Sequence, residues 1–230
     1  MHVMREIILD TETTGLSPAQ GHRIIEIGCI ELFNHLPTGK SFHAYINPER
    51  DVPEISTKIT GLTTEFLKSH PIFEKVVHDF LAFIGEDPLV IHNAYFDMAF
   101  LNAELERVKL PVLPKSRAID TLYMARQKFP GSPASLDALC KRFNVDLSKR
   151  DKHGALLDSE LLAQVYLELL GGRQRSLGLI ETQEETLIEI EEITTVYPVR
   201  VFEISEEEKS KHREFLSQLK SPLWANILGN

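Results

Sequence analysis

Two acidic residues follow a short apolar run near the start of the chain and limit what this segment can form. Ile7, Ile8 and Leu9 are typical of a buried strand, and Asp10 and Glu12 come directly after them. In an extended strand, residues i and i+2 point to the same face, so these carboxylates lie side by side at the strand's C-terminal end. Adjacent carboxylates repel each other, and Mg²⁺ and Mn²⁺ prefer carboxylate oxygens. The pattern therefore predicts a divalent-metal site at the end of a buried strand.

Two later segments offer further metal ligands and a base. Asp97 ends the segment His92-Asn-Ala-Tyr-Phe-Asp97, and four residues separate His153 from Asp158. Five helical residues turn through roughly 500°, so His153 and Asp158 cannot share one face of a continuous helix. We expect His153 on a mobile loop next to Gly154 and Asp158 in the first turns of the following helix. Four carboxylates and one histidine on three segments indicate two-metal phosphodiester hydrolysis, in which the histidine takes a proton from the attacking water.

The composition is that of a soluble globular protein. Of the 230 residues, 43% are hydrophobic and 26% are charged. No apolar run approaches the roughly 18 residues that a membrane span requires, and no signal-peptide pattern precedes the first strand. Cys29 and Cys140 both lie in apolar periodic segments, so we expect reduced core thiols and a cytoplasmic protein.

The net charge of -9 indicates that the chain alone binds DNA weakly, because non-specific binding depends on basic surface. One local basic cluster precedes His153. It can face phosphates beside the active site or form a solvated loop, and charge alone favours neither. Its members are Lys141, Arg142, Lys149, Arg150 and Lys152.

Hydrophobic periodicity predicts an α/β domain followed by a linker and a short helical tail. Strands are expected over residues 5–10, 23–33, 41–46, 88–92 and 117–121, and helices over residues 72–84, 95–108, 121–128, 135–143 and 155–170. Three early strands followed by alternating helices and strands imply a mixed five-stranded sheet flanked by helices. Residues 181–192 are acidic and typical of a linker. Ser205-x-x-Glu208 is a capping box that begins a short helix. His92, Asp120 and Asp137 are expected to be structural.

The three acidic segments also resemble a known family. In order, Asp10-Thr-Glu12-Thr-Thr-Gly, His92-Asn-Ala-Tyr-Phe-Asp97 and His153-x4-Asp158 are similar to the motifs of the DEDDh 3′→5′ exonucleases, which have a ribonuclease-H-like fold. The resemblance covers about residues 5–170. It implies that two divalent metal ions, Mg²⁺ or Mn²⁺, bind to Asp10, Glu12, Asp97 and Asp158. It also implies that His153 is the general base.

The same resemblance implies a binding site for the 3′-terminal nucleotide. Its residues would be Thr11, Glu12, Leu16, Thr60 and Phe96. Thr60 departs from the family pattern, because many relatives carry histidine at this position. The contact to the terminal nucleotide is therefore expected to differ here, while catalysis survives.

Two segments after the catalytic domain resemble partner-binding elements. Gln174-Arg-Ser-Leu177-Gly-Leu179 is similar to the short peptide that binds the bacterial sliding clamp. An apolar cluster in the terminal segment is expected to bind a polymerase, since aromatic anchors dominate small interfaces, or to fold back onto its own domain. The cluster includes Phe215, Leu219, Leu223 and Trp224.

This arrangement resembles the proofreading subunits of bacterial DNA polymerase III. The expected organisation is an exonuclease domain (1–172), a clamp-binding peptide with an acidic linker (173–195) and a polymerase-binding tail (196–230). The implied partners are the DNA primer 3′ end, the catalytic (alpha) subunit of the polymerase and the sliding clamp. The chain is expected to be a monomer within a hetero-oligomer in the bacterial cytoplasm, without a membrane partner. Two alternatives remain: a free-standing DEDDh exonuclease that trims RNA or short oligonucleotides, and a scaffold between clamp and polymerase.

Overall fold

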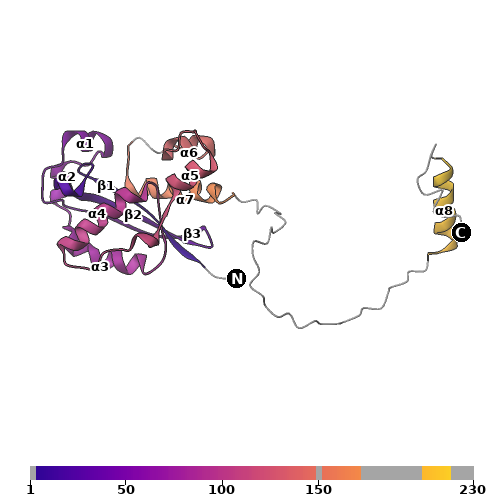
Figure 1. The fold of residues 1–230 in the computed structure, drawn as a ribbon, viewed down its shortest axis with the longest axis horizontal. Helices are drawn as coiled ribbons and strands as arrows, with labels where there is room; N and C mark the ends of the chain where they lie inside the picture. The colour runs from indigo at the N-terminus through magenta and orange to yellow at the C-terminus, as the bar shows by residue number, and fades with distance from the viewer. Residues whose placement is uncertain (1–3, 149–151, 172–203, 219–230) are drawn as a thin grey trace. The chain divides into compact units, whose positions relative to one another are not determined.

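A mixed five-stranded sheet forms the centre of the first unit of the chain (Figure 1). The structure is a computed structural model that describes residues 4–148, 152–171 and 204–218. It divides into two units, Met1–Leu179 and Ile180–Asn230. The strands are β1 (Arg5–Thr13), β2 (Ile24–Phe33), β3 (Leu36–Tyr45), β4 (Leu89–Ile91) and β5 (Ala118–Asp120). Their order in the sheet is β3-β2-β1-β4-β5. β1, β2 and β3 form antiparallel pairs, whereas β4 is parallel to β1 and β5 is parallel to β4. The expected mixed α/β sheet is confirmed.

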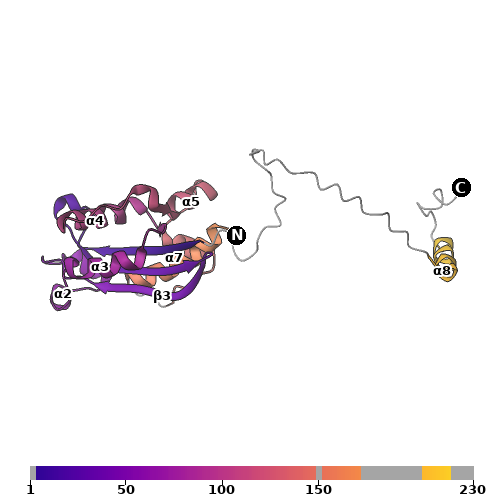
Figure 2. The same ribbon diagram turned by 90° about the horizontal axis from the view of Figure 1, so that it is seen from below.

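Helices cover both faces of this sheet (Figures 1 and 2). They are α1 (Glu54–Thr60), α2 (Thr64–Lys68), α3 (Phe73–Ile84), α4 (Ala94–Arg107), α5 (Thr121–Lys128), α6 (Leu136–Arg142) and α7 (Ala155–Leu169). On one face, α3 and α4 bury Phe80 and Leu101 against Ile7. On the other face, α5, α6 and α7 bury apolar side chains such as Val165 against Ile8. Each such side chain contributes about 1.5–3 kcal/mol through removal from water.

Strand alternation decides which helix each residue of β1 meets. Ile8 packs in the core cluster under α7, so Asp10 and Glu12, two and four residues later, point toward the same face. Thr11 points to the opposite face, where α4 lies, and its hydroxyl contacts Asp97. The end of β1 is therefore flanked by α7 on one side and α4 on the other.

Several predicted elements have different bounds in the structure. β1 continues to Thr13, three residues beyond the predicted end, so Asp10 and Glu12 both lie in its C-terminal part, as predicted. β2 is buried from Ile24 to Leu32, because α7 covers the face that carries Glu26 and Gly28. β3 begins at Leu36, earlier than predicted, because it pairs with β2 directly after a short turn. The helices α1 and α2 were not predicted.

The described part of the second unit is one helix, α8 (Glu206–Ser217). The predicted capping box is confirmed: Ser205 accepts a hydrogen bond from the backbone of Glu208, whose carboxylate accepts one from the backbone of Ser205. The prediction that Cys29 and Cys140 are thiols in the core is also confirmed, because both are buried and neither is paired in a disulfide. Among the described helices, none is long and apolar enough to cross a membrane.

Candidate metal and active site

Three of the predicted site residues converge beside the end of β1. Glu12, His153 and Asp158 each offer one ligand atom, and these atoms lie within 4.8 Å of one another. Nδ1 of His153 is 3.3 Å from Oδ2 of Asp158. Asp10 lines a pocket together with His153 and Asp158. As predicted, His153 precedes a helix, and Asp158 lies in its first turn.

A glycine in β2 allows the helix that carries Asp158 to approach the sheet. Gly28 lies opposite Asp10 in the strand pair, and a Cβ built on it would be 2.3 Å from the backbone of Ala155. The hydroxyl of Ser159 donates to the carbonyl of Gly28 at 2.9 Å. No other residue type leaves room for this approach. Gly28 therefore determines how near Asp158 comes to Asp10.

Asp97 is joined to β1 from the opposite face. Its Oδ1 accepts hydrogen bonds from the backbone amide of Thr11 at 3.0 Å and from the hydroxyl of Thr11 at 2.6 Å. Asp97 lies in the first turn of α4 and is buried. Both side chains are thereby fixed in place. Thr11 is itself buried, and its hydroxyl is used within the protein.

Burial and mutual repulsion disfavour the charged forms of these carboxylates. Burial raises the pKa of Asp10 well above its usual value, and the charges of Asp97 and Glu12 raise it further. Burial also raises the pKa of Asp97 to about 7, although the hydrogen bonds from Thr11 act in the opposite direction. A divalent cation would remove this repulsion, and oxygen donors suit Mg²⁺ or Mn²⁺. The donor set therefore fits such a metal.

Glu26 belongs to this site although the sequence did not single it out. It lies opposite Glu12 in the pairing of β1 with β2, is buried, and accepts a hydrogen bond from Nε2 of His43 at 2.7 Å. Its charge contributes to the raised pKa of Asp10, after burial and the nearer carboxylates. Glu26 and Gly28 are two residues apart in β2 and therefore share one face, but this spacing does not show that α7 covers it.

The residues expected around the terminal nucleotide have different surroundings. Leu16, three residues after the end of β1, is 84% exposed. Phe96 is half-buried and packs against Phe100, with ring centroids 4.9 Å apart. The hydroxyl of Thr60 donates to the carbonyl of Ser56 and accepts from the amide of Leu62. Because Thr60 is 9% exposed, little of this side chain is available to a ligand.

Most of the expected partner-binding residues lie outside the described part of the chain. These are Gln174, Leu177, Leu179, Leu219, Leu223 and Trp224. The same holds for Lys149 and Arg150 of the basic cluster. Phe215 is described, and it is 60% exposed on α8.

Comparison with curated proteins finds close relatives over nearly the whole chain. DNA polymerase III subunit epsilon of Rickettsia felis is 52% identical over 225 residues, which cover 95% of this chain and 98% of the relative. The protein of the same name from Haemophilus influenzae is 39% identical over 247 residues, which cover 98% of this chain and 96% of the relative.

Solved structures and a family profile agree with these relatives. Exonuclease X in complex with 5′ overhanging duplex DNA matches with a TM-score of 0.57 and 25% identity, over 72% of this chain and 90% of that chain. The nuclease domain of 3′hExo, a DEDDh family member bound to rAMP, shares the fold with a TM-score of 0.62 and 23% identity, over 74% of this chain and 92% of that chain. The family described as Exonuclease (RNase_T) matches residues 7–166. The chain therefore belongs to the exonuclease family, in the group that bears the name DNA polymerase III subunit epsilon, and is a metal-dependent 3′→5′ exonuclease.

Proposed function

We propose that this exonuclease is the proofreading subunit of a bacterial replicative DNA polymerase, acts in the cytoplasm and removes mispaired nucleotides from the primer 3′ end. The observation that carries the proposal is the convergence of Glu12, His153 and Asp158 within 4.8 Å beside Asp10. The relatives' names support the polymerase context. The chain's net charge of -9 implies weak affinity for DNA. Tethering to a polymerase would compensate, because it gives a high effective concentration of primer ends at the nuclease site.

In the proposed site, Asp10, Glu12, Asp97 and Asp158 hold two divalent metal ions, Mg²⁺ or Mn²⁺. When bound, such ions activate a water and stabilise the attacking and leaving oxygens. We assign Asp10 as the ligand shared by both ions, because it lines the pocket with Asp158 and the charges of Asp97, Glu12 and Asp158 all act on it. Thr11 orients Asp97 through two hydrogen bonds.

His153 is the proposed general base. About half of its side chain (48%) is exposed, so one ring nitrogen can face a water in the pocket while Nδ1 lies near Asp158. Its backbone amide donates to the carbonyl of Ile59 at 3.2 Å, which connects the histidine segment to α1. His153 takes the proton of the attacking water, and the products are a 5′-mononucleotide and a strand shortened by one residue.

The proposed terminal-nucleotide site lies around the exposed side chain of Leu16, with Thr11, Glu12 and Phe96 beside it. Leu16 can pack against the terminal base because it is 84% exposed. Gly15 is held beneath the ring of His22: a Cβ built on it would be 2.3 Å from this ring. His22 thus positions the turn that presents Leu16. Thr60 would affect the terminal-nucleotide site mainly by setting the backbone conformation at the end of α1, because its hydroxyl already bonds to Ser56 and Leu62.

Cleavage is expected to start only at a free 3′-hydroxyl. A 3′-mispaired primer should be shortened about tenfold or more faster than a paired one, because an unpaired base costs less to unstack. A primer that ends in a 3′-phosphate should resist cleavage. Gel analysis of 5′-labelled primers with Mg²⁺ measures both effects. Cleavage of circular single-stranded DNA would contradict the assignment, and faster degradation of RNA than of DNA would favour the free-standing alternative.

Two segments are proposed to attach the enzyme to its partners, the sliding clamp and the polymerase catalytic (alpha) subunit. The clamp would bind Gln174, Leu177 and Leu179. The alpha subunit would bind the tail, residues 196–230, through Phe215, Leu219, Leu223 and Trp224. The 60% exposure of Phe215 on α8 supports this proposal, because a large apolar side chain is left open to a partner.

Changes in the two segments should separate the two partners. Alanine at Gln174, Leu177 and Leu179 should weaken clamp binding without changing hydrolysis of a short oligonucleotide. Deletion of 196–230 should abolish co-purification with the alpha subunit while clamp binding persists, because each segment serves one partner. Affinity measurements with each purified partner test this, and each variant is the control for the other. A truncated chain that still binds the alpha subunit would refute the proposed tail function.

A further inference from the structure

The pocket beside the candidate metal site extends away from the carboxylates toward a single arginine. It has a volume of about 430 Å³, within the range of ligand sites. Asp10, His153 and Asp158 line one part of it, and Leu122 and Arg126 of α5 line another. Leu122 and Arg126 are four residues apart, so they share one face of the helix. The pocket thus joins the candidate metal site to a positive charge.

Arg126 has no internal partner among the described residues. Arg107 at the end of α4 also has none, but only Arg126 of the two lines this pocket. Arg5 and Arg23 form ion pairs, Arg50 and Arg117 donate to backbone carbonyls, and Arg142 stacks on Phe129. Within the described residues, Arg126 forms no hydrogen bond or ion pair. It is exposed near the end of α5, where Lys128 already donates to the carbonyls of Glu168 and Leu169. The five N–H donors of Arg126 are therefore available to a ligand.

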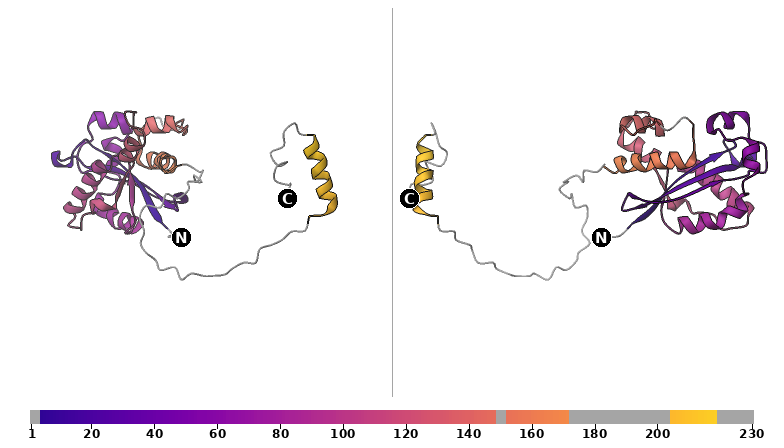
Figure 3. Two further views of the ribbon diagram at one scale, coloured as in Figure 1. Left: turned by 45° about the vertical axis from the view of Figure 1, so that its right-hand side comes forward. Right: turned by 180° about the vertical axis from the view of Figure 1, so that it is seen from behind.

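The position of α5 relative to α1 indicates which part of a substrate Arg126 can meet. The carbonyl of Ile59 in α1 accepts from the amide of His153, so α1 borders the site on one flank. α5 and α6 lie on another flank, as Figures 1 and 3 show from different sides. The terminal nucleotide is proposed to lie near Leu16, outside this pocket. The strand that precedes it can then leave the site along α5.

We propose that the guanidinium of Arg126 binds the phosphate on the 5′ side of the penultimate nucleotide, one phosphate upstream of the bond that is cut. This inference rests on the proposed exonuclease site. A guanidinium suits the task because it is always charged and binds two phosphate oxygens at once. The reacting phosphate would be neutralised at the carboxylate-bound metals, whereas the next phosphate has no cation among the described residues of the pocket except Arg126.

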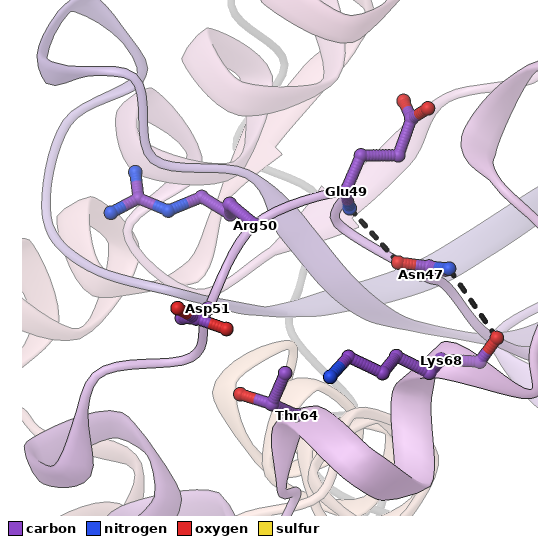
Figure 4. Close-up of a pocket in the computed structure, with 6 residues that line it drawn as sticks. All are labelled: Asn47, Glu49, Arg50, Asp51, Thr64 and Lys68. Atoms are coloured by element: carbon purple, nitrogen blue, oxygen red, sulfur yellow. Dashed lines mark hydrogen bonds between the residues drawn. The ribbon is translucent and has the colours of Figure 1, made fainter.

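A second pocket, shown in Figure 4, does not offer the same site. It has a volume of about 360 Å³ and includes Arg50 and Lys68, but Glu49 and Asp51 line it as well. Arg50 donates to the carbonyl of Gly21, so part of its hydrogen-bonding capacity is used. Charges of both signs leave no net attraction for a phosphate. Arg126 remains the better candidate.

Two dinucleotides test the inference directly. The thymidine dinucleotide TpT has only the scissile phosphate, whereas pTpT has one further phosphate at its 5′ end. We expect the wild-type enzyme with Mn²⁺ to hydrolyse pTpT with a kcat/KM about tenfold higher, the typical effect of a charged hydrogen bond. Arg126→Gln should bring this ratio close to one, without changing hydrolysis of TpT. Arg126→Lys should retain part of the preference.

Salt dependence and a matched arginine complete the test. For pTpT, Arg126→Gln should lower the slope of log(kcat/KM) against log[salt] by about 0.7, the value for one phosphate of a single strand. Arg107→Gln is the control, because Arg107 ends α4, ten residues or about 15 Å along the helix from Asp97. It should leave the ratio and the slope unchanged.

The possible outcomes distinguish this inference from the proposed function. A wild-type ratio of one, a ratio unchanged in Arg126→Gln, or equal losses on both dinucleotides would each overturn the role of Arg126. A wild-type enzyme that hydrolyses neither dinucleotide nor a longer strand would instead refute the proposed exonuclease site.

Discussion

Asp10→Asn is expected to abolish hydrolysis while leaving the metal-free fold at least as stable as the wild type. The amide cannot supply the charge that a divalent cation requires, and the charges of Asp97, Glu12 and Asp158 all act on Asp10. Metal ions contribute several kcal/mol of transition-state stabilisation, so kcat should fall by at least about 10³-fold. Cleavage of a 3′-mispaired primer at saturating Mg²⁺ measures this. Asp158→Asn should behave alike.

The stability of the same variant tests the electrostatic argument. A carboxyl whose pKa is raised in the folded protein contributes stability that is fully present below its pKa in the unfolded chain and is lost as the pH rises through its folded-state pKa. The pKa of Asp10 is raised by burial and by its neighbours, and that of Asp97 to about 7. In EDTA, the wild type should therefore be less stable at pH 8 than at pH 6.

Asp10→Asn should reduce this dependence on pH and raise the free energy of unfolding at pH 8 by about 0.5–2 kcal/mol. Denaturant unfolding at both pH values measures it. Asp79→Asn, at an exposed position of α3, is the matched control and should leave both stability and activity unchanged. Full nuclease activity in Asp10→Asn, or a marked loss of metal-free stability, would contradict the proposed site.

His153→Ala is expected to slow hydrolysis by roughly 10²–10⁴-fold, the usual contribution of a positioned base. Its side chain is about half exposed (48%), so the fold should not change. Single-turnover cleavage with saturating Mn²⁺ measures the rate, and added imidazole should restore part of it. His78→Ala, at an exposed position of α3, is the control.

Metal binding distinguishes a base from a ligand at this position. His153 lies close enough to Glu12 and Asp158 to serve as either. A general base can be removed without loss of metal affinity, so calorimetric Mn²⁺ titration of His153→Ala should resemble that of the wild type. A large loss of affinity would reassign His153 as a metal ligand.

The sequence predicted the longer elements of the fold because periodicity and end signals agreed there. The helix predicted over 72–84 is α3 (Phe73–Ile84), and Gly85 caps its C-terminal end. The helices α1 and α2 were missed because they have only seven and five residues. Apolar residues such as Ile55 and Phe66 are also exposed on them, so no clear buried stripe marks either helix.

The sequence predicted which side chains meet at the end of β1, but not the residues that support them. The i and i+2 spacing correctly placed Asp10 and Glu12 on one face of a strand, and helix geometry correctly separated His153 from Asp158. The functions of Gly28 and Glu26 depend on which helix covers β2, and this is a tertiary contact without a local signal. The absence of an internal partner for Arg126 within the described residues likewise becomes visible only when its surroundings are known.

The most direct test of the central claim is anomalous diffraction from crystals of the full chain soaked with Mn²⁺ and a thymidine 5′-monophosphate product. We predict two manganese peaks about 4 Å apart, with Asp10 between them and Glu12, Asp97 and Asp158 around them. The product phosphate should contact both ions. The absence of manganese from these carboxylates at saturating concentration, or its binding elsewhere in the chain, would contradict the account.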